Sequence, residues 1–351
     1  MSIKRIDEVI ERGIAEWRFP GAVCVVARGK EIVHRKAYGS TMYDDPDSKP
    51  VTLDTIYDIA SITKVFTATA LLRLVDQGVM NLEDRLARYF PEFATPTKRR
   101  ITIRDLLSHR AGLDLVSSSL RTLPAKTIRE DMLRAEPNPK IAGWDWYTNI
   151  NFAILGFLIE KVAEQLLDRA MHELVLEPLG LSNTLYRPPK ALRPRIAPSE
   201  NDRTWRKKLL WGEVNDDSGW ALGGTAGHAG LFSTAADLLT FGRTWLEGGR
   251  FRGKKFLSKE LVEQATKRVS EVHPSNSFFY PGFHGLGWRI DLRVAPKDSY
   301  GHGGFTGPLL QLFPKRRTIL VFLTNLQYPR RDKTKSLTSI WESLVDSLAV
   351  E

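Results

Sequence analysis

The sharpest chemical feature of the sequence is a serine and a lysine that lie three residues apart. Residues 60–64 read ASITK and begin a helical pattern that we predict over residues 62–77. At this spacing the side chains of Ser61 and Lys64 share one face of the first helical turn. A serine hydroxyl is a weak nucleophile until a base removes its proton, and a desolvated lysine has a pKa low enough to help. The alternative is that Ser61 only caps the helix and Lys64 lies on the surface.

Two further polar side chains precede another predicted helix. Tyr147 and Asn149 come directly before the apolar pattern of residues 150–166. A tyrosine can act as an acid or a base where nearby cations lower its pKa, and an asparagine amide can hold a lysine or a substrate carbonyl. The alternative is a buried tyrosine followed by an asparagine that caps the helix. Beside them, Trp146 is a candidate for lining an apolar substrate pocket.

A glycine-rich stretch near the end of the chain contains a histidine. Residues 300–307 read YGHGGFTG and precede an apolar run that is typical of a strand. Glycine at this density lets the backbone approach another group closely or adopt a positive φ. We therefore expect His302, Gly303 and Gly304 at the edge of a cleft, where their backbone faces a substrate. The stretch alone is also compatible with a phosphate loop or with the oxyanion loop of an α/β-hydrolase.

Together, the three stretches resemble the signature of the serine β-lactamase and penicillin-binding-protein superfamily. In that signature S-x-x-K is followed by Y-x-N, and then by a basic residue with x-G before a C-terminal strand. Tyr147 lies 86 residues and His302 lies 241 residues after Ser61, which is similar to the class C-like branch. Four stretches are also similar to it: YDIASITK at 57–64, LLSHRAGL at 106–113, GHAGLFST at 227–234 and GLGW at 285–288. The resemblance covers nearly the whole chain.

The resemblance implies a role for each of these residues in acyl transfer. Ser61 would be the acylated nucleophile, and Lys64 the base or proton relay beside it. Tyr147 would be the general base or acid, and Asn149 would orient the lysine and the substrate. The backbone N–H groups of Ser61 and Phe305 would form the oxyanion hole. The implied reaction is a two-step acyl transfer to water that needs no metal ion and no cofactor.

The third motif departs from the K-T-G or K-S-G of members that handle antibiotics, in which the lysine and the hydroxyl help to bind the carboxylate of the substrate. Here Gly303 has no hydroxyl, and a histidine such as His302 is largely neutral at pH 7, since its unperturbed pKa is about 6.5. This difference favours a carboxylesterase that acts on small esters. We also expect activity to fall as the pH drops through the pKa of His302.

Two other functions stay open at this point. One is an amidohydrolase of the same fold, either a D-aminopeptidase or a muropeptide (N-acetylmuramoyl-L-alanine) amidase, with weak β-lactamase activity. GHAGLFST at 227–234 is similar to stretches of muropeptide amidases. The other is a ligand-binding module on an inactive hydrolase fold, which the intact Ser61, Lys64 and Tyr147 argue against. Within GHAGLFST, we expect His228 to have a structural role and to hold loop carbonyls.

Predicted strands lie at both ends of the chain, and predicted helices lie between them. The patterns predict helices near 3–17, 62–77, 102–109, 127–135, 150–166, 168–176 and 334–348, and strands at 22–27, 31–38 and in three runs after Gly285. Links such as residues 314–317 are too short for a crossover helix, so the strands should pair antiparallel. We therefore predict an α+β fold, in which an antiparallel sheet is flanked by the N- and C-terminal helices and a mainly helical domain is inserted.

This order divides the chain into two predicted domains with the active site in the cleft between them. Residues 1–60 and 226–351 would form a discontinuous sheet domain, and residues 61–225 a mainly helical domain. The antiparallel pairing and the lack of a G-x-S-x-G elbow argue against an α/β-hydrolase. The lack of G-x-x-x-x-G-K-[ST] excludes a P-loop.

Composition restricts the class of protein and its partners. The 351 residues carry a net charge of +10, but the basic clusters are scattered, so we expect solvated surface charge and no nucleic-acid partner. The single cysteine, Cys24, excludes an internal disulfide and is expected to be buried. No apolar run reaches the roughly 18 residues of a membrane span, and no signal-peptide pattern begins the chain. We expect a cytoplasmic protein without a membrane partner, whose substrate is a small ester or amide.

Overall fold

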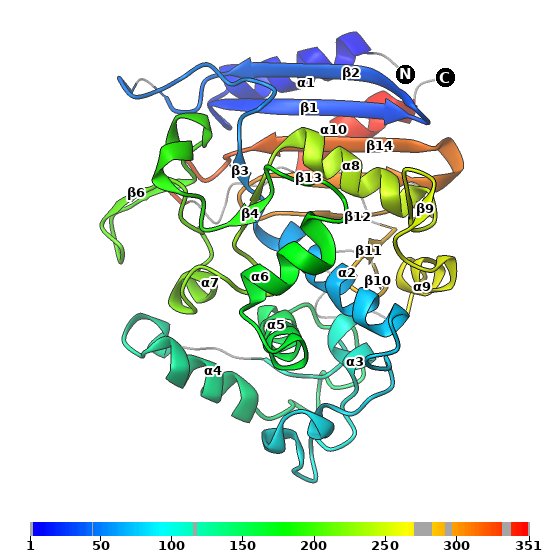
Figure 1. Ribbon diagram of the computed structural model, residues 1–351. Coiled ribbons are helices and arrows are strands. Elements are labelled where there is room, and N and C mark those ends of the chain that lie inside the picture. The colour runs from blue at the N-terminus through cyan, green and yellow to red at the C-terminus, as the bar shows by residue number, and fades with distance from the viewer. Residues whose placement is uncertain are drawn as a thin grey trace.

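A seven-stranded antiparallel sheet, built from both ends of the chain, is central to the computed structural model (Figure 1). The structure describes residues 3–43, 45–114, 118–269, 283–291, 297–331 and 338–349. In sheet order the strands are β10 (Phe283–His284), β11 (Arg289–Ile290), β12 (Tyr300–Gly303), β13 (Leu309–Phe313), β14 (Thr318–Thr324), β1 (Gly21–Arg28) and β2 (Glu31–Gly39). β14 pairs with β1, with Cys24 opposite Phe322. The predicted antiparallel sheet is therefore confirmed.

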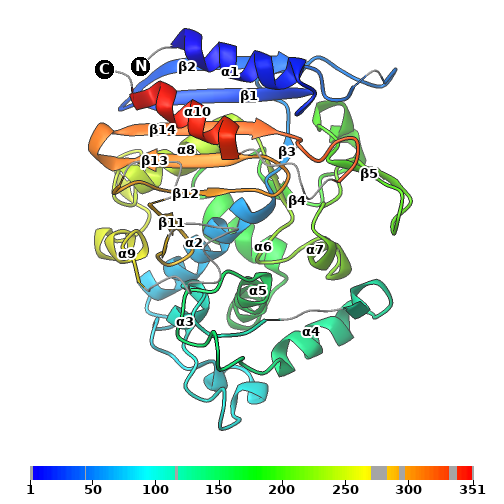
Figure 2. The ribbon, with the colours of Figure 1, turned by 180° about the vertical axis from the view of Figure 1, so that it is seen from behind.

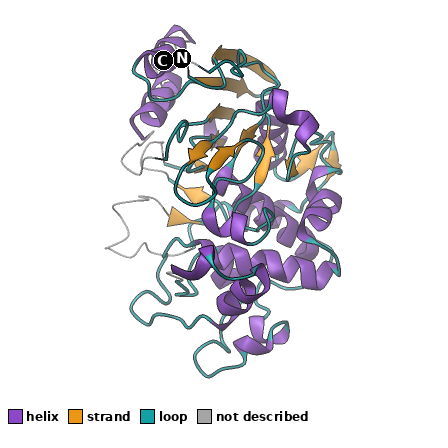
Figure 3. Cartoon of the chain, turned by 90° about the vertical axis from the view of Figure 1, so that its left-hand side faces the viewer, coloured by secondary structure: helices purple, strands orange, loops and turns teal. Residues whose placement is uncertain are grey.

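Helices cover both faces of this sheet. α1 (Ile3–Ala15) and α10 (Thr338–Ala349) lie side by side on one face (Figure 2), and α8 (Ala235–Leu246) lies on the other. All seven residues of β14 are buried, which is the reason its sequence is continuously apolar rather than alternating. Cys24 points into the layer under α1 and α10 and is fully buried, as predicted. From the side, both termini lie at the α1 and α10 end of the molecule, opposite the helical region (Figure 3).

The helices between the terminal strands gather below the sheet in Figure 1. They are α2 (Thr63–Asp76), α3 (Ile103–Leu107), α4 (Ala125–Arg134), α5 (Asn149–Ala163), α6 (Leu167–Met171), α7 (Asp217–Ala221) and α9 (Lys259–Ala265). The predicted helix 168–176 is α6 continued by a π-turn at His172–Leu176. No helix among the described residues is long and apolar enough to cross a membrane.

The central helix α2 is buried on all sides over most of its length. Every residue from 63 to 72 is buried, whether it is apolar or polar. Two buried threonines of this helix find hydrogen-bond partners inside the protein. Thr67 donates a hydrogen bond to the carbonyl of Gly227 (2.7 Å), and Thr69 donates one to the carbonyl of Val65 (2.6 Å). A helix in this position can present a lysine to a site that solvent barely reaches.

Short strands interrupt the region that the sequence predicts to be helical. β4 (Leu185–Tyr186) joins β3 (Tyr57–Asp58) and β7 (Leu231–Ser233) in a small antiparallel sheet. The structure also contains two hairpins that the sequence pattern misses: β5 (Glu200–Asp202) with β6 (Lys208–Leu210), and β8 (Arg250–Phe251) with β9 (Lys254–Lys255). Because the small sheet spans the predicted boundaries at 60 and 225, the two-domain division stays a prediction.

The predicted strand that begins at Gly285 is shorter than expected. Residues 285–288 form bends, and only Arg289–Ile290 pair as a strand. Gly287 has φ +84° and lies so close to α2 that a Cβ would be 2.4 Å from the Cβ of Ala68. This close approach requires glycine, and it breaks the strand pattern. The last helix is described from Thr338, so residues 334–337 of the prediction lie outside the described residues.

We predict that Phe66→Ala lowers the free energy of unfolding by about 3–5 kcal/mol, because the cavity left in a packed core is only partly refilled. The Phe66 ring on α2 stacks on Phe241 of α8 (centroids 4.1 Å apart) and so joins the helical region to the layer over the sheet. Urea unfolding followed by circular dichroism measures the change. Val79→Ala is the control: Val79 is 49% exposed, so its change should stay within about 0.5 kcal/mol. Equal losses in the two variants would contradict the prediction.

Candidate active site

Ser61 lies in a short 3-10 turn, Ala60–Ile62, that leads into α2. Ala60 has φ +45°, a conformation that residues other than glycine rarely adopt, and its N–H donates to Asp58 Oδ1 at 2.8 Å. The turn leaves Ser61 half-buried, whereas Lys64, one turn later, is fully buried. Lys64 Nζ donates to Ser61 Oγ at 3.0 Å. Ser61 does not cap the helix and Lys64 does not lie on the surface, so both alternative interpretations are wrong.

Three oxygen atoms surround the amino group of Lys64. Besides Ser61 Oγ, they are Asn149 Oδ1 at 2.9 Å and the carbonyl oxygen of His228 at 3.3 Å. Burial lowers the pKa of Lys64 to about 7, although the carboxylate of Asp216 raises it in part. A large fraction of Lys64 is therefore neutral near pH 7, and a neutral amine can accept a proton from the serine hydroxyl.

Tyr147 borders the same two residues. Its phenol hydrogen-bonds with Ser61, and its ring centroid is 4.8 Å from Lys64 Nζ. Burial in the surrounding protein raises the pKa of Tyr147 to about 12, although the hydrogen bond with Ser61 and the charge of Arg289 lower it. The condition of a depressed pKa is not met, because burial outweighs the effect of the nearby cation. At neutral pH the phenol keeps its proton, which suits a donor or a relay rather than the initial base.

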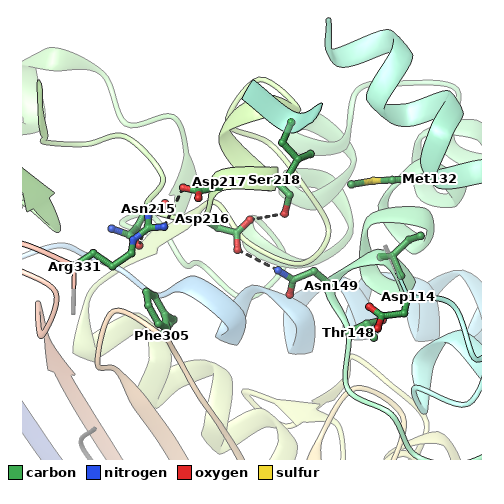
Figure 4. Close-up of a pocket in the computed structure, with 12 residues that line it drawn as sticks. Asp114, Met132, Thr148, Asn149, Asn215, Asp216, Asp217, Ser218, Phe305 and Arg331 are labelled. Carbon is green, nitrogen blue, oxygen red and sulfur yellow. Dashed lines mark hydrogen bonds and ion pairs between the residues drawn. The ribbon is translucent and has the colours of Figure 1, made fainter. Parts of the chain in front are cut away.

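Asn149 is the first residue of α5 and connects Lys64 to a second polar group. Its Oδ1 accepts from Lys64, and its Nδ2 donates to Asp216 Oδ2 at 3.1 Å (Figure 4). The residue in the capping position is Thr148, so the alternative interpretation of Asn149 as a helix cap is wrong.

Asp216, which no sequence motif marks as a site residue, comes directly before α7. Its Oδ1 accepts from the N–H of Gly219 (2.8 Å), the hydroxyl of Ser218 (2.6 Å) and Nε2 of His228 (3.0 Å). Burial raises the pKa of Asp216, but the charge of His228 and these hydrogen bonds outweigh it and hold the pKa well below its usual range. The only signal in the sequence is an aspartate before a short helix, which is common for a helix cap. His228 holds this carboxylate, so the prediction that its ring holds loop carbonyls is wrong.

His302 lies on β12 and is buried, with 1% of its surface exposed. Its Nδ1 is 2.8 Å from the carbonyl oxygen of Gly303 and therefore carries the proton, because a carbonyl only accepts. Burial, together with the charges of Lys64 and Arg289, lowers the pKa of His302 well below 6.5. The histidine is neutral at pH 7, as expected. A loss of activity through its titration would fall well below pH 6.5, not near it.

The glycines after His302 bring the end of β12 against the turn that carries Ser61. A Cβ on Gly304 would lie 2.7 Å from the carbonyl oxygen of Ile59, so this contact requires glycine. Thr306 secures it, because its hydroxyl donates to the carbonyl of Asp58 at 2.7 Å. The oxyanion role of the Ser61 and Phe305 N–H groups stays a prediction, as does substrate binding by Gly304.

Gly303 faces the opposite side of the sheet. A Cβ there would lie 2.4 Å from the Trp341 ring of α10, so a threonine or serine at this position would collide with that ring. Substrate binding by Gly303, which stays a prediction, could involve only its backbone.

Three imidazole rings surround Tyr147. His109 lies at 4.7 Å, His284 at 5.6 Å and His302 at 6.0 Å between ring centroids. His284 is fixed by the buried carboxylate of Asp145, whose Oδ1 is 2.7 Å from its Nδ1. Within the described part of the chain, no three histidine, cysteine, aspartate or glutamate side chains are arranged to hold a metal ion. This packed shell determines where the phenol of Tyr147 lies.

A cavity of about 380 Å³ adjoins Asn149 and Phe305 (Figure 4). The residues that line it are Asp114, Leu120, Met132, Thr148, Asn149, Ile150, Asn215, Asp216, Asp217, Ser218, Phe305 and Arg331. Ser61 and Trp146 are not among these described lining residues, so a pocket role for Trp146 stays a prediction. Arg331 is already paired: it contacts Asp217 at 3.1 Å and Glu200 at 3.0 Å. The lining therefore offers carboxylates and a neutralised guanidinium.

The sequence is similar to one family over nearly its whole length. Residues 6–344 match the family model described as Beta-lactamase. The chain is 31% identical to a protein of Escherichia coli (strain K12) named "Putative D-alanyl-D-alanine carboxypeptidase", over 88% of this chain and 78% of that protein. It is 30% identical to a protein of the same name from Salmonella agona (strain SL483), over 92% and 82%.

Solved structures are similar in fold. EstCE1, described as a hydrolase with promiscuous acyltransferase activity, has a TM-score of 0.76 and 23% identity, over 99% of this chain and 98% of its own. A penicillin-binding-protein homologue from Caulobacter crescentus has a TM-score of 0.76 and 20% identity, over 99% and 96%. These likenesses confirm the predicted fold, and the family match confirms the resemblance drawn from the motifs.

We predict that the reaction of Ser61 with a fluorophosphonate probe slows as the pH falls through about 7. Protonated Lys64, with a pKa of about 7, cannot accept the serine proton, so the rate should rise through that pH and then level off. Mass spectrometry of the labelled Ser61 peptide gives the rate at each pH. His302→Gln should keep the same midpoint, because His302 is already neutral there. If the midpoint moved in this variant, the fall in labelling rate at low pH would be assigned to the titration of His302 instead of Lys64.

We predict that Gly304→Ala slows the same labelling by about 100-fold, because displacing positioning groups by about 1 Å has effects of this size. The added Cβ would push the end of β12 away from Ile59 and from the turn that carries Ser61. Gly78→Ala is the control for backbone strain: Gly78 has φ +73° and no atom near its Cβ position, so the variant should lose about 1 kcal/mol of stability and keep the labelling rate. Unchanged labelling in Gly304→Ala would show that the contact does not position the site.

Proposed function

The chain belongs to the beta-lactamase family, and we propose that it is a serine hydrolase that forms an acyl-enzyme on Ser61. The observation that carries the proposal is the contact of 3.0 Å between Lys64 Nζ and Ser61 Oγ, made by a lysine whose pKa burial lowers to about 7. A hydroxyl beside a neutral amine, with a protonated phenol on its other side, can be activated and can pass its proton on.

The proposed acylation uses these three groups in order. Lys64 accepts the proton of Ser61 as Oγ forms a bond to the substrate carbonyl carbon. The oxygen that becomes negative lies between the N–H groups of Ser61 and Phe305, an arrangement whose individual donors are typically worth about 3–4 kcal/mol. When the tetrahedral intermediate collapses, the phenol of Tyr147 donates its proton to the leaving group, and Lys64 returns the serine proton to the phenolate. In deacylation, a water molecule takes the place of the leaving group and the same proton transfers run in reverse. This step restores the hydroxyl of Ser61 and releases the acid.

Small esters are the substrates that this site favours. A free carboxylate beside the scissile bond needs a fixed cation, but His302 is neutral, and Arg331 already pairs with Asp217 and Glu200. The cavity lining adds the carboxylate of Asp114 near Thr148 (Figure 4). A neutral ester avoids the repulsion, so we propose a carboxylesterase. The enzyme would act in the cytoplasm on a small-molecule substrate. It would bind neither a nucleic acid nor a membrane.

A second candidate is an amidohydrolase that acts on D-amino-acid peptides or muropeptides. The observation in its favour is the curated relatives at 30–31% identity, whose name refers to D-alanyl-D-alanine. Such a substrate would bring a terminal carboxylate, for which Arg331 is the cation in the described lining of the cavity.

We predict that kcat/KM for p-nitrophenyl butyrate exceeds that for a diacetylated D-alanyl-D-alanine tripeptide, a D-alanyl anilide, a muropeptide and nitrocefin by at least about 100-fold, since a site without a carboxylate partner discriminates by this order. Ser61→Ala should lower ester hydrolysis by about 1000-fold or more. Ser182→Ala, at an exposed serine, is the matched control and should keep the wild-type rate. Preference for an amide substrate would replace the esterase by the second candidate. If the fluorophosphonate probe gives no adduct on Ser61 and no substrate is turned over, the ligand-binding module remains as the interpretation.

A further inference from the structure

We propose that Asp216 and His228 are positioning residues that hold Lys64 against Ser61 through a closed ring of hydrogen bonds. The inference rests on the proposed function, in which Lys64 activates Ser61. The ring runs from Lys64 Nζ to Asn149 Oδ1 (2.9 Å), from Asn149 Nδ2 to Asp216 Oδ2 (3.1 Å), from Asp216 Oδ1 to His228 Nε2 (3.0 Å), and from the His228 carbonyl back to Lys64 Nζ (3.3 Å).

A carboxylate at position 216 decides which way the amide of Asn149 points. Carboxylate oxygens accept hydrogen bonds and do not donate them, so Asp216 selects the orientation in which Asn149 presents Nδ2 to it. The other end of the amide, Oδ1, then faces Lys64. In the flipped amide, Oδ1 would face the carboxylate, so the hydrogen bond with Asp216 would be lost, and Nδ2 would face the amine, whose protonated form cannot accept.

His228 contributes to the ring with both its side chain and its backbone. Its Nε2 must donate, because Asp216 only accepts, while its carbonyl oxygen accepts from Lys64. The loop that carries it is fixed from two sides. Thr67 donates to the carbonyl of Gly227, and a Cβ at Gly227 would lie 2.1 Å from the carbonyl oxygen of Phe152 on α5. His228 therefore holds the amine of Lys64 and the carboxylate of Asp216 in one geometry.

The charge of Asp216 also acts on Lys64 through the ring. Lys64 is fully buried, and the oxygens of Ser61, Asn149 and His228 that accept from it are neutral. Its charged form is therefore stabilised by the carboxylate of Asp216, which lies on the far side of Asn149. The titratable and charged groups around it come from several elements: His109 after α3, Tyr147 before α5, Asp216 before α7, His228 before β7, Arg289 on β11 and His302 on β12. Asp216 raises the pKa of Lys64 and Arg289 lowers it.

The test compares wild type with Asp216→Asn in the rate of fluorophosphonate labelling of Ser61 as a function of pH. The neutral amide no longer selects the orientation of Asn149, so we expect the plateau rate to fall at least tenfold. Removal of the negative charge also lowers the pKa of Lys64, so the midpoint of the acid limb should move to lower pH. A purely structural role would lower the rate at every pH and leave the midpoint in place.

Two variants of His228 provide an independent test. Glutamine can donate from Nε2 to Asp216, whereas leucine cannot donate at all, and both leave the backbone carbonyl in place. We expect His228→Gln to keep most of the labelling rate and His228→Leu to lose at least tenfold. If Asp216→Asn does not fold, as judged by circular dichroism, this pair decides the question.

The outcomes separate the two proposals. If wild-type protein gives no adduct on Ser61, the proposed function fails. If wild type is labelled and Asp216→Asn has the same plateau and midpoint, the serine hydrolase stands and the positioning role is overturned. Equal rates for His228→Gln and His228→Leu would overturn the role of His228 in the same way.

Discussion

The burial of Lys64 is the constraint on which the rest of the site depends. A lysine with no exposed surface loses its hydration, which lowers its pKa and costs free energy unless protein groups replace the water. Those groups come from segments far apart in the chain: Ser61 before α2, Asn149 on α5 and the loop at His228. Because α2 is buried on all sides, the amine can be held there at all. The same burial that makes Lys64 costly lowers its pKa into the range that the proposed base needs near neutral pH.

Two groups beside the site, His302 and Arg331, are not free to bind a substrate carboxylate as cations. Burial keeps His302 neutral where antibiotic-handling relatives place a lysine, and Arg331 is engaged by two carboxylates. The packing explains part of the departure in the third motif, since Trp341 occupies the space that a side chain at Gly303 would need. In the proposed function, charge and packing together favour a neutral substrate over one with a terminal carboxylate.

Much of the fold could be predicted from local patterns, because strands and amphipathic helices bury one face and show it in their periodicity. The antiparallel pairing of β13 and β14 follows from the short link between them. Prediction failed where tertiary contacts override the pattern. Gly287 breaks a predicted strand because α2 approaches it closely. The short strand β4 pairs with segments distant in sequence, and no local pattern marks it.

By itself, the sequence determined which residues could do the chemistry: Ser61 and Lys64 share a helical turn, and that spacing is local. It also determined the family, through motifs that span the chain. Only the tertiary structure decided their state, because a pKa depends on burial and on charges brought from elsewhere. It is the fold that raises the pKa of Tyr147, lowers the pKa of His302, and brings Asp216 to Asn149. An aspartate before a short helix has no local mark of that contact, which exists only when α5 and α7 are packed together.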